Sequence, residues 1–156
     1  MTDTPIATLH ATAIRRAFAY GAVFGLGALV ILVAFWQPPA IGWQIFLIAF
    51  GAATLVVAER MRRATRVPLI LSEGALSDGS GLELTTLDNI ASVDRGAFAF
   101  KPSNGFILRL HRPVASGWAP GMWWRYGRRI GVGGVTAQGA GKFMAEQIAL
   151  RIKSDS

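Results

Sequence analysis

The chain contains no cysteine, and only nine of its 156 residues are acidic. The lack of cysteine excludes disulfide bonds, thiolate metal sites and cysteine nucleophiles, although it does not identify the cellular compartment. Histidine is scarce as well, because His10 and His111 are the only two and lie far apart in the sequence. Neither a Ser–His–acid arrangement nor a cluster of carboxylates is evident. We therefore expect no catalytic residues and no metal site.

Positive charge and apolar residues are plentiful by contrast. Sixteen Lys and Arg residues give the chain a net charge of +7. Such a balance suits a nucleic acid, an anionic lipid or an acidic protein partner about equally well. Apolar residues make up 52% of the chain, and they are concentrated in its N-terminal part. This distribution favours membrane segments over an unusually large core.

Two long uncharged runs dominate the N-terminal part, at residues 17–36 and 41–58. A helix of about 20 residues rises about 30 Å, which matches the hydrocarbon thickness of a bilayer. The short link between the runs contains two consecutive prolines, which end a helix and force the runs to be antiparallel neighbours. Residues 15–60 are therefore predicted to form a transmembrane helical hairpin, with Trp36 and Trp43 in the interfacial aromatic belt.

The charges around the hairpin predict its orientation. Arg15 and Arg16 precede the first run, four arginines follow the second, and the turn carries no charge. By the positive-inside rule both termini should be cytoplasmic, as in a multi-pass protein of the bacterial inner membrane. Residues 1–14 are mostly small and polar, and we expect them to be a mobile N-terminus.

Two other interpretations of the apolar runs stay open. A secretory signal peptide is disfavoured, because the first run is too long, lacks a small-x-small cleavage site and is followed directly by another run. The second run contains Gln44 and Gly51. It could therefore be a buried core helix or a re-entrant segment instead of a second span.

Small residues recur along one face of each predicted helix. A row of this kind lets helices approach closely in a membrane. We expect these rows to pack the hairpin on itself, with a partner-binding face as the alternative. The residues concerned are Ala17, Gly21 and Gly25 in the first run and Ala49, Ala52 and Ala53 in the second.

From residue 67 onward the sequence changes to short alternating segments separated by turn residues. Such alternation is typical of antiparallel strands. Asn104-Gly105 is the strongest hairpin signal, since these residues tolerate the positive φ of a tight turn. Residues 112–121 are rich in Pro and Gly and are expected to form a loop. The predicted strands lie at residues 67–71, 75–78, 82–87, 90–93, 95–101, 106–111, 122–126 and 129–135.

The C-terminal segment has the period of a helix. Ala140, Met144, Ile148 and Ile152 fall four residues apart and form one apolar stripe. Thr136 has the side chain of an N-cap residue and stands shortly before the stripe. An amphipathic helix that closes a small antiparallel sheet or barrel is the simplest packing of these elements.

This order of elements resembles a pleckstrin-homology-like (PH-like) domain. The resemblance is carried by the opening strand at residues 67–73, by residues 87–93, and by the strand at 130–135 that leads into a helix at 137–153. With a transmembrane pair before it, the chain is similar to small bacterial membrane proteins that carry a cytoplasmic PH-like domain. The resemblance implies an α+β membrane protein with a PH-like barrel at residues 67–153. It implies no shared catalytic residues.

The densest functional signal lies between residues 109 and 129, where arginines alternate with aromatic residues and no acidic residue occurs. Guanidinium forks suit phosphate groups, and indole rings suit the membrane interface. The same residue types form hot spots between proteins. Core tryptophans beside a solvated strand face are a further interpretation. The candidate residues are Arg109, Arg112, Trp118, Trp123, Trp124, Arg125, Arg128 and Arg129.

These observations lead to two hypotheses of function. The first is a non-enzymatic accessory or scaffolding subunit of a larger integral membrane complex, which acts through its cytoplasmic domain. The second is a membrane-tethered module that binds anionic lipid headgroups. Nucleic acid is not expected as a partner, because no recognised module is present and the chain is tethered to the membrane. No cofactor is expected, and a homo-oligomer is compatible with both hypotheses.

Overall fold

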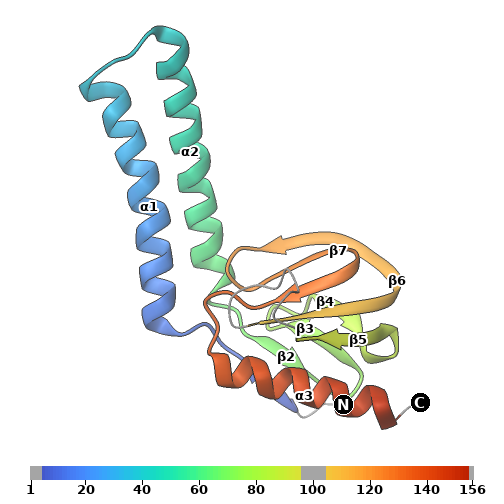
Figure 1. The fold of residues 1–156 in the computed structure, drawn as a ribbon. Helices are drawn as coiled ribbons and strands as arrows, with labels where there is room; N and C mark the ends of the chain where they lie inside the picture. Colours follow the sequence, from blue (N-terminus) through green and yellow to red (C-terminus); the bar gives the residue numbers. More distant parts are fainter. Residues whose placement is uncertain (1–4, 96–104, 155–156) are drawn as a thin grey trace.

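The structure, a computed structural model, describes residues 5–95 and 105–154. Two long helices project from a domain of two antiparallel sheets and a C-terminal helix, so the predicted α+β class is confirmed (Figure 1). The elements are β1 (Ala7–Leu9), α1 (Ala13–Trp36), α2 (Ile41–Ala64), β2 (Leu69–Leu71), β3 (Ala75–Asp78), β4 (Glu83–Thr86), a 3₁₀ turn (Leu87–Asn89), β5 (Ile90–Asp94), β6 (Phe106–Ala119), β7 (Trp123–Val132) and α3 (Gln138–Ser154).

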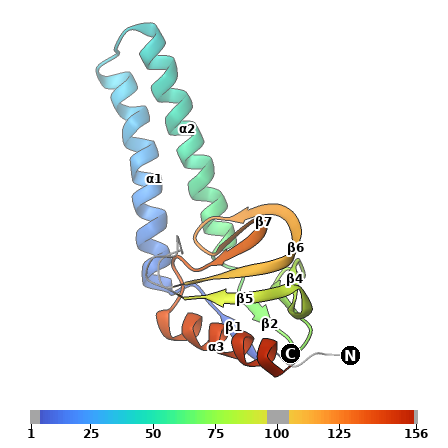
Figure 2. The ribbon, with the colours of Figure 1, turned by 45° about the vertical axis from the view of Figure 1, so that its right-hand side comes forward.

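Helices α1 and α2 form an antiparallel pair that stands clear of the sheets (Figures 1 and 2). Their most apolar 18-residue windows have mean hydropathies of 2.3 and 2.0, and only 11% of each window is buried. A core helix of a soluble protein would be mostly covered by the rest of the chain. Both helices are long and apolar enough to cross a membrane.

The two helices pack through small residues, but not through those expected. Gly27 of α1 faces Gly51 of α2, and a Cβ placed on Gly51 would lie 3.0 Å from the carbonyl oxygen of Gly27. Two further small residues are buried in the helices, Ala34 toward the turn between them and Ala58 toward the sheets. The two helices therefore approach closely through small residues, at positions other than those predicted.

The predicted rows do not line the contact within the hairpin, and this part of the prediction is wrong. A Cβ added to Gly21 or Gly25 would meet no atom within 4 Å. Spacing of four residues identifies one face of a helix, but it does not show which face meets the neighbouring helix. The exposed residues of the two rows are Ala17, Gly21, Gly25, Ala49, Ala52 and Ala53.

The N-terminal segment contains a strand where a mobile tail was expected. β1 pairs with β2, with Ala7 opposite Leu71 and Leu9 opposite Leu69. Leu9 is completely buried, and Ala7 is 7% exposed. The expectation of a mobile N-terminus over residues 1–14 is therefore wrong for β1. Strand pairing and the burial of apolar side chains hold this strand in place.

The helical hairpin is inserted between two neighbouring strands of one sheet. That sheet has the order β1-β2-β3-β4, with β1 before α1 and β2 after α2. Pairing of these two strands holds the start of α1 and the end of α2 at the same domain. The folded domain thus consists of β1 together with residues 69–154, and not of residues 67–153 alone.

β6 and β7 form one long hairpin across the region where a loop was predicted. β6 runs through most of residues 112–121 to Ala119, and β7 is a single strand in place of two. Two register shifts between Arg109 and Gly117 accommodate Pro113 without ending the strand. We call residues 106–132 the β6–β7 ribbon; it curves back toward α2 in Figures 1 and 2.

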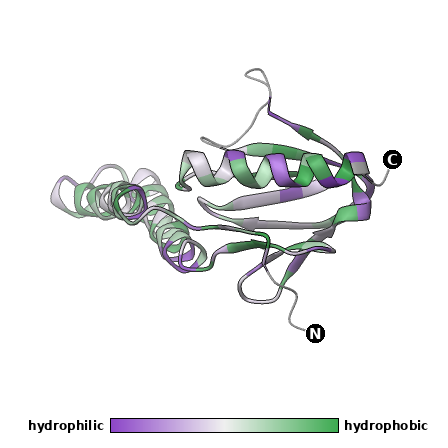
Figure 3. Ribbon diagram, turned by 90° about the horizontal axis from the view of Figure 1, so that it is seen from below, coloured by the Kyte–Doolittle hydropathy of each residue, from purple (hydrophilic) through white to green (hydrophobic). Residues whose placement is uncertain are grey.

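Helix α3 covers the side of the domain away from the hairpin (Figures 1 and 2), and in Figure 3 it lies in front of the sheets. Met144 and Ile148 are fully buried, which confirms the predicted apolar stripe. Thr136 is not the N-cap that was expected, since it forms a β-bridge with Ala11 and the helix begins at Gln138. The bridge ties the segment before α3 to the segment before α1.

Two sequence predictions concern the connection between β5 and β6. The strand predicted at residues 95–101 and the Asn104-Gly105 turn lie outside the described residues, apart from Arg95 and Gly105. The second sheet has the order β5-β6-β7. Over residues 5–95 and 105–154, the two sheets do not close into a barrel.

Candidate functional site

All eight candidate residues lie on the two strands of the β6–β7 ribbon. The structure therefore brings the arginines and tryptophans together on one element, as their density in the sequence indicates. They differ in exposure. Trp123 is buried, Trp124 and Arg125 are half-buried, and the exposed residues are Arg109, Arg112, Trp118, Arg128 and Arg129.

The two adjacent tryptophans at the start of β7 make different packing contacts. Trp123 is 7% exposed and belongs to the hydrophobic core. Trp124 lies against Gly131, where an added Cβ would overlap the indole ring. Glycine at 131 thus permits the ribbon to fold back on itself. Trp123 thus corresponds to a core tryptophan, one of the interpretations left open by the sequence, while Trp124 is half-buried.

Arg125 connects the ribbon to the first sheet. Its guanidinium carbon lies 5.6 Å from the centroid of the Trp123 ring. Its Nη1 donates a hydrogen bond of 3.0 Å to the backbone carbonyl of Glu83 at the start of β4. Its Nε is buried and has no hydrogen-bond partner among the described residues. These contacts give Arg125 a structural role.

The exposed arginines form an unbalanced cationic surface. Arg109 of β6 lies directly opposite Arg129 of β7. Like charges in this arrangement repel each other and destabilise the strand pair. Arg109 has a long ion pair with Asp94, at 3.5 Å between Nη2 and Oδ2. In the described part of the chain, Arg128 and Arg129 have no ion pair with an acidic residue.

The backbone at the bend of the ribbon is held by a side chain that sequence reasoning missed. Asn89 accepts a hydrogen bond of 2.8 Å from the backbone N–H of Arg112 and donates one of 3.2 Å to its carbonyl oxygen. The side chain of Arg112 stays exposed. An asparagine after a strand is read from sequence as a turn residue, so no local signal distinguishes this long-range role.

Two large aromatic side chains are exposed on the same ribbon. Trp118 is 58% exposed, and Tyr126 is 75% exposed. Trp118 pairs with Trp124 across the strands, and Tyr126 follows Trp124 by two residues. The alternation of side chains along a strand therefore places all three rings on one face. Tyr126 was not among the eight candidates, although it lies within the aromatic-rich stretch of the sequence.

The tip of the ribbon contacts the last turn of α2. Gly121 has a φ of +80°, and a Cβ added to it would lie 3.0 Å from Met61 Cε and 3.4 Å from Thr65 Cγ2. Thr65 is buried, and its hydroxyl donates a hydrogen bond of 2.8 Å to the Met61 carbonyl oxygen. The tip of the β6–β7 ribbon is thus fixed next to the end of an apolar helix.

The start of α1 is joined to the same region of the domain. The backbone N–H of Thr12 donates a 3.0 Å hydrogen bond to the carbonyl oxygen of Val135. Arg15 Nη1 reaches the carbonyl oxygen of Thr136 at 3.4 Å. Val135 N–H in turn donates to the Gly121 carbonyl oxygen at 3.0 Å. The end of α2 therefore contacts the ribbon tip, and the start of α1 contacts the segment that leads to α3.

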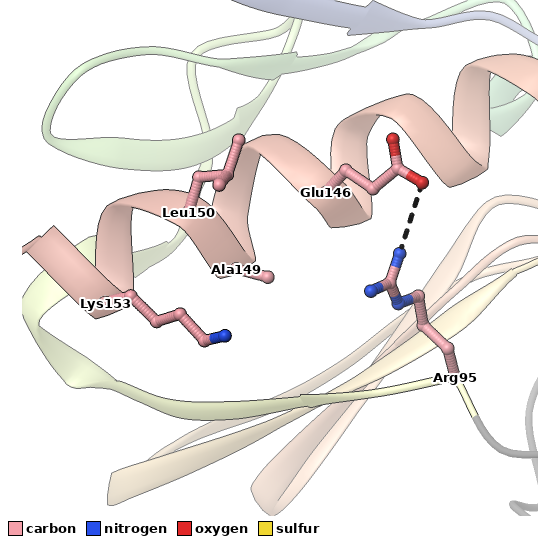
Figure 4. A pocket seen from close by; sticks show the side chains of 5 residues that line it. All are labelled: Arg95, Glu146, Ala149, Leu150 and Lys153. Atoms are coloured by element: carbon pink, nitrogen blue, oxygen red, sulfur yellow. Dashed lines mark hydrogen bonds and ion pairs between the residues drawn. The ribbon is translucent and has the colours of Figure 1, made fainter.

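One shallow pocket lies between α3 and the end of β5 (Figure 4). It is lined by Arg95, Glu146, Ala149, Leu150 and Lys153, with 3.5 Å between Arg95 Nη1 and Glu146 Oε1. The described residues that line this open pocket show no arrangement for nucleophilic or acid–base chemistry. The described residues contain no group of three or more side chains placed to hold a metal ion.

No model of a known protein family matches the chain, and no curated protein or solved structure matches it. The surface of the β6–β7 ribbon and its attachment to the hairpin are therefore the basis for assigning a function.

Proposed function

We propose that this chain is a non-enzymatic protein of the bacterial inner membrane that acts as an accessory or scaffolding subunit of a larger membrane complex. The observation that carries the proposal is the insertion of the helical hairpin between β1 and β2. A domain attached at both ends of a hairpin has less freedom than one on a single linker. It presents a defined surface at the bilayer, as a scaffold for an integral partner requires.

The proposed domain type is PH-like. Its support is the order of four strands in one sheet, three in the next and a single helix at the end. In this arrangement the hairpin takes the place of the connection between the first two strands.

The proposed orientation places the domain in the cytoplasm. Its support is the positive charge at the ends of the two helices that meet the domain. Arg15 and Arg16 lie in the first turn of α1, Arg60 lies near the end of α2, and Arg66 follows α2. Because β1 pairs with β2, the segments that carry these charges belong on the same side of the bilayer.

The subunit proposal is tested by purifying the full-length tagged chain from its native membrane in a mild detergent. We expect a stoichiometric integral partner on native gels and in mass spectra. The Arg128→Glu/Arg129→Glu variant should lose that partner, while the matched Lys142→Glu variant on α3 should keep it. A wild-type chain that migrates alone would contradict the subunit proposal. Retention of the partner by the double variant would contradict the assignment of the ribbon as its binding surface.

Binding of anionic lipid headgroups is the second candidate function. The opposed Arg109 and Arg129 favour it, because an anion between two like charges relieves their repulsion. Phosphate groups of lipids are anions that guanidinium groups bind in a bidentate manner.

A further inference from the structure

We infer that the β6–β7 ribbon faces the bilayer, with Trp118 and Tyr126 in the headgroup layer and Arg112, Arg128 and Arg129 on anionic lipid phosphates. This inference rests on the second candidate function and on insertion of the hairpin into the membrane. It adds an orientation for the domain, in which α3 is turned toward the cytoplasm.

The position of the ribbon tip supports this orientation. Gly121 packs against Met61 and Thr65, so the tip lies beside the turn where α2 ends. The exposed residues Arg60 and Arg66 flank that turn, and arginines at the end of a span belong at headgroup level. The ribbon also forms the side of the domain from which the helices extend in Figures 1 and 2. The ribbon therefore comes close to the headgroup layer wherever the hairpin spans the bilayer.

The exposed aromatic rings fit such a position. Trp118 and Tyr126 are on one face and more than half exposed, so each leaves a large apolar ring surface in water. Both side chains combine an apolar ring with a polar N–H or O–H group, which is why they concentrate at membrane interfaces. Contact with the headgroup layer would remove this ring surface from water without a protein partner.

The cations on the ribbon match an anionic bilayer surface. Arg112, Arg128 and Arg129 are exposed, and each basic residue held near anionic lipid adds to the attraction. α3 supplies a comparison within the same domain. It lies on the opposite side (Figures 1 and 2) and exposes Lys142 and Lys153. Removal of positive charge from the ribbon should thus weaken lipid contact, whereas removal from α3 should leave it nearly unchanged.

The depth of Trp118 is measured by fluorescence quenching of the full-length chain in vesicles of brominated phosphatidylcholine that also contain phosphatidylglycerol. We expect Trp118→Phe to remove a measurable share of the fluorescence that bromine near the headgroups quenches. Trp36→Phe reports on the far end of the hairpin and should also remove quenchable fluorescence. Loss with Trp36→Phe but not with Trp118→Phe would overturn the orientation and leave hairpin insertion intact. No loss with either variant would overturn hairpin insertion as well.

The charge contribution is measured by varying phosphatidylglycerol and salt in the same vesicles. Quenching of Trp118 should increase with phosphatidylglycerol and decrease with salt, because salt screens the attraction. Arg128→Ala/Arg129→Ala should lose most of this increase, and the control Lys142→Ala/Lys153→Ala should keep it. Thermal unfolding shows whether both variants are folded. Equal increases in wild type and the ribbon variant would overturn the role of these arginines.

Discussion

Leu9 lies directly opposite Leu69 in the four-stranded sheet, although the whole helical hairpin separates the two residues in the sequence. Both side chains are completely buried. The strand before the hairpin therefore completes the core of the domain that follows it. The apolar helical hairpin and the folded domain are in this way one structural unit.

Replacement of residues 13–66 by a flexible Gly/Ser loop should leave a domain that folds in water. β1 and β2 remain joined in this chain. The entropic cost of closing a flexible loop rises only slowly with its length, so the Gly/Ser loop should cost little stability. A fragment that begins at residue 67 lacks β1 and should remain unfolded or aggregate. Circular dichroism melting curves and amide NMR spectra distinguish the two. Equally cooperative melting of both would show that β1 is dispensable.

Leu9→Ala should destabilise this loop-linked domain by about 2–5 kcal/mol, as expected for truncation of a completely buried leucine. The matched control is Thr8→Ala, at the exposed middle position of the same strand. It should change the free energy of unfolding by less than about 0.5 kcal/mol. Urea denaturation measures both values. Similar small losses for the two variants would argue against burial of β1.

Gly51→Ala should weaken the contact between α1 and α2. The added Cβ would lie 2.5 Å from Ile31 Cγ1 and 3.0 Å from the Gly27 carbonyl oxygen. Overpacking of this kind costs about 1–3 kcal/mol. Gly25→Ala, whose Cβ meets no atom within 4 Å, should be neutral or slightly stabilising. Thermal denaturation in detergent micelles compares them. An equal loss with Gly25→Ala would indicate that the Ala17/Gly21/Gly25 row packs against another molecule.

Arg125→Ala should lower the stability of the domain by about 1–2 kcal/mol, since it removes the cation–π contact with Trp123 and the hydrogen bond to Glu83. Arg128→Ala, at an exposed position of the same strand, should leave the free energy of unfolding nearly unchanged. Chemical denaturation of the loop-linked domain measures the difference. Binding experiments should therefore vary Arg128 and Arg129 and leave Arg125 in place. A comparable loss with Arg128→Ala would assign that residue a structural role too.

Local patterns were sufficient to predict several elements. The two apolar helices follow from long uncharged runs, because a helix able to span lipid satisfies its own backbone hydrogen bonds and needs only length and hydropathy. Strands β2 to β5 lie close to their predicted positions, since alternation and turn residues are also local signals. The density of arginine and aromatic residues likewise identified the β6–β7 ribbon as the candidate surface.

Other features depend on contacts between distant residues. β1 has only three residues, too few for a periodic signal, and it is a strand because β2 is beside it. Pro113 and Gly117 are typical of a loop, yet register shifts between the paired strands absorb them. The helix contact passes through Gly27 and Gly51 because the position of the second helix selects the face.

The sequence by itself determined the two apolar runs, the α+β class and the stretch rich in arginine and tryptophan. Each of these depends on the composition or periodicity of one segment. Only the tertiary structure decided which of those side chains are exposed. The curvature of the ribbon turns Trp123 and Arg125 inward and leaves Trp118 and Arg129 in contact with solvent. The physical reason is that the burial of a side chain is set by its neighbours from other elements. The spacing of residues along one strand carries no information about those neighbours.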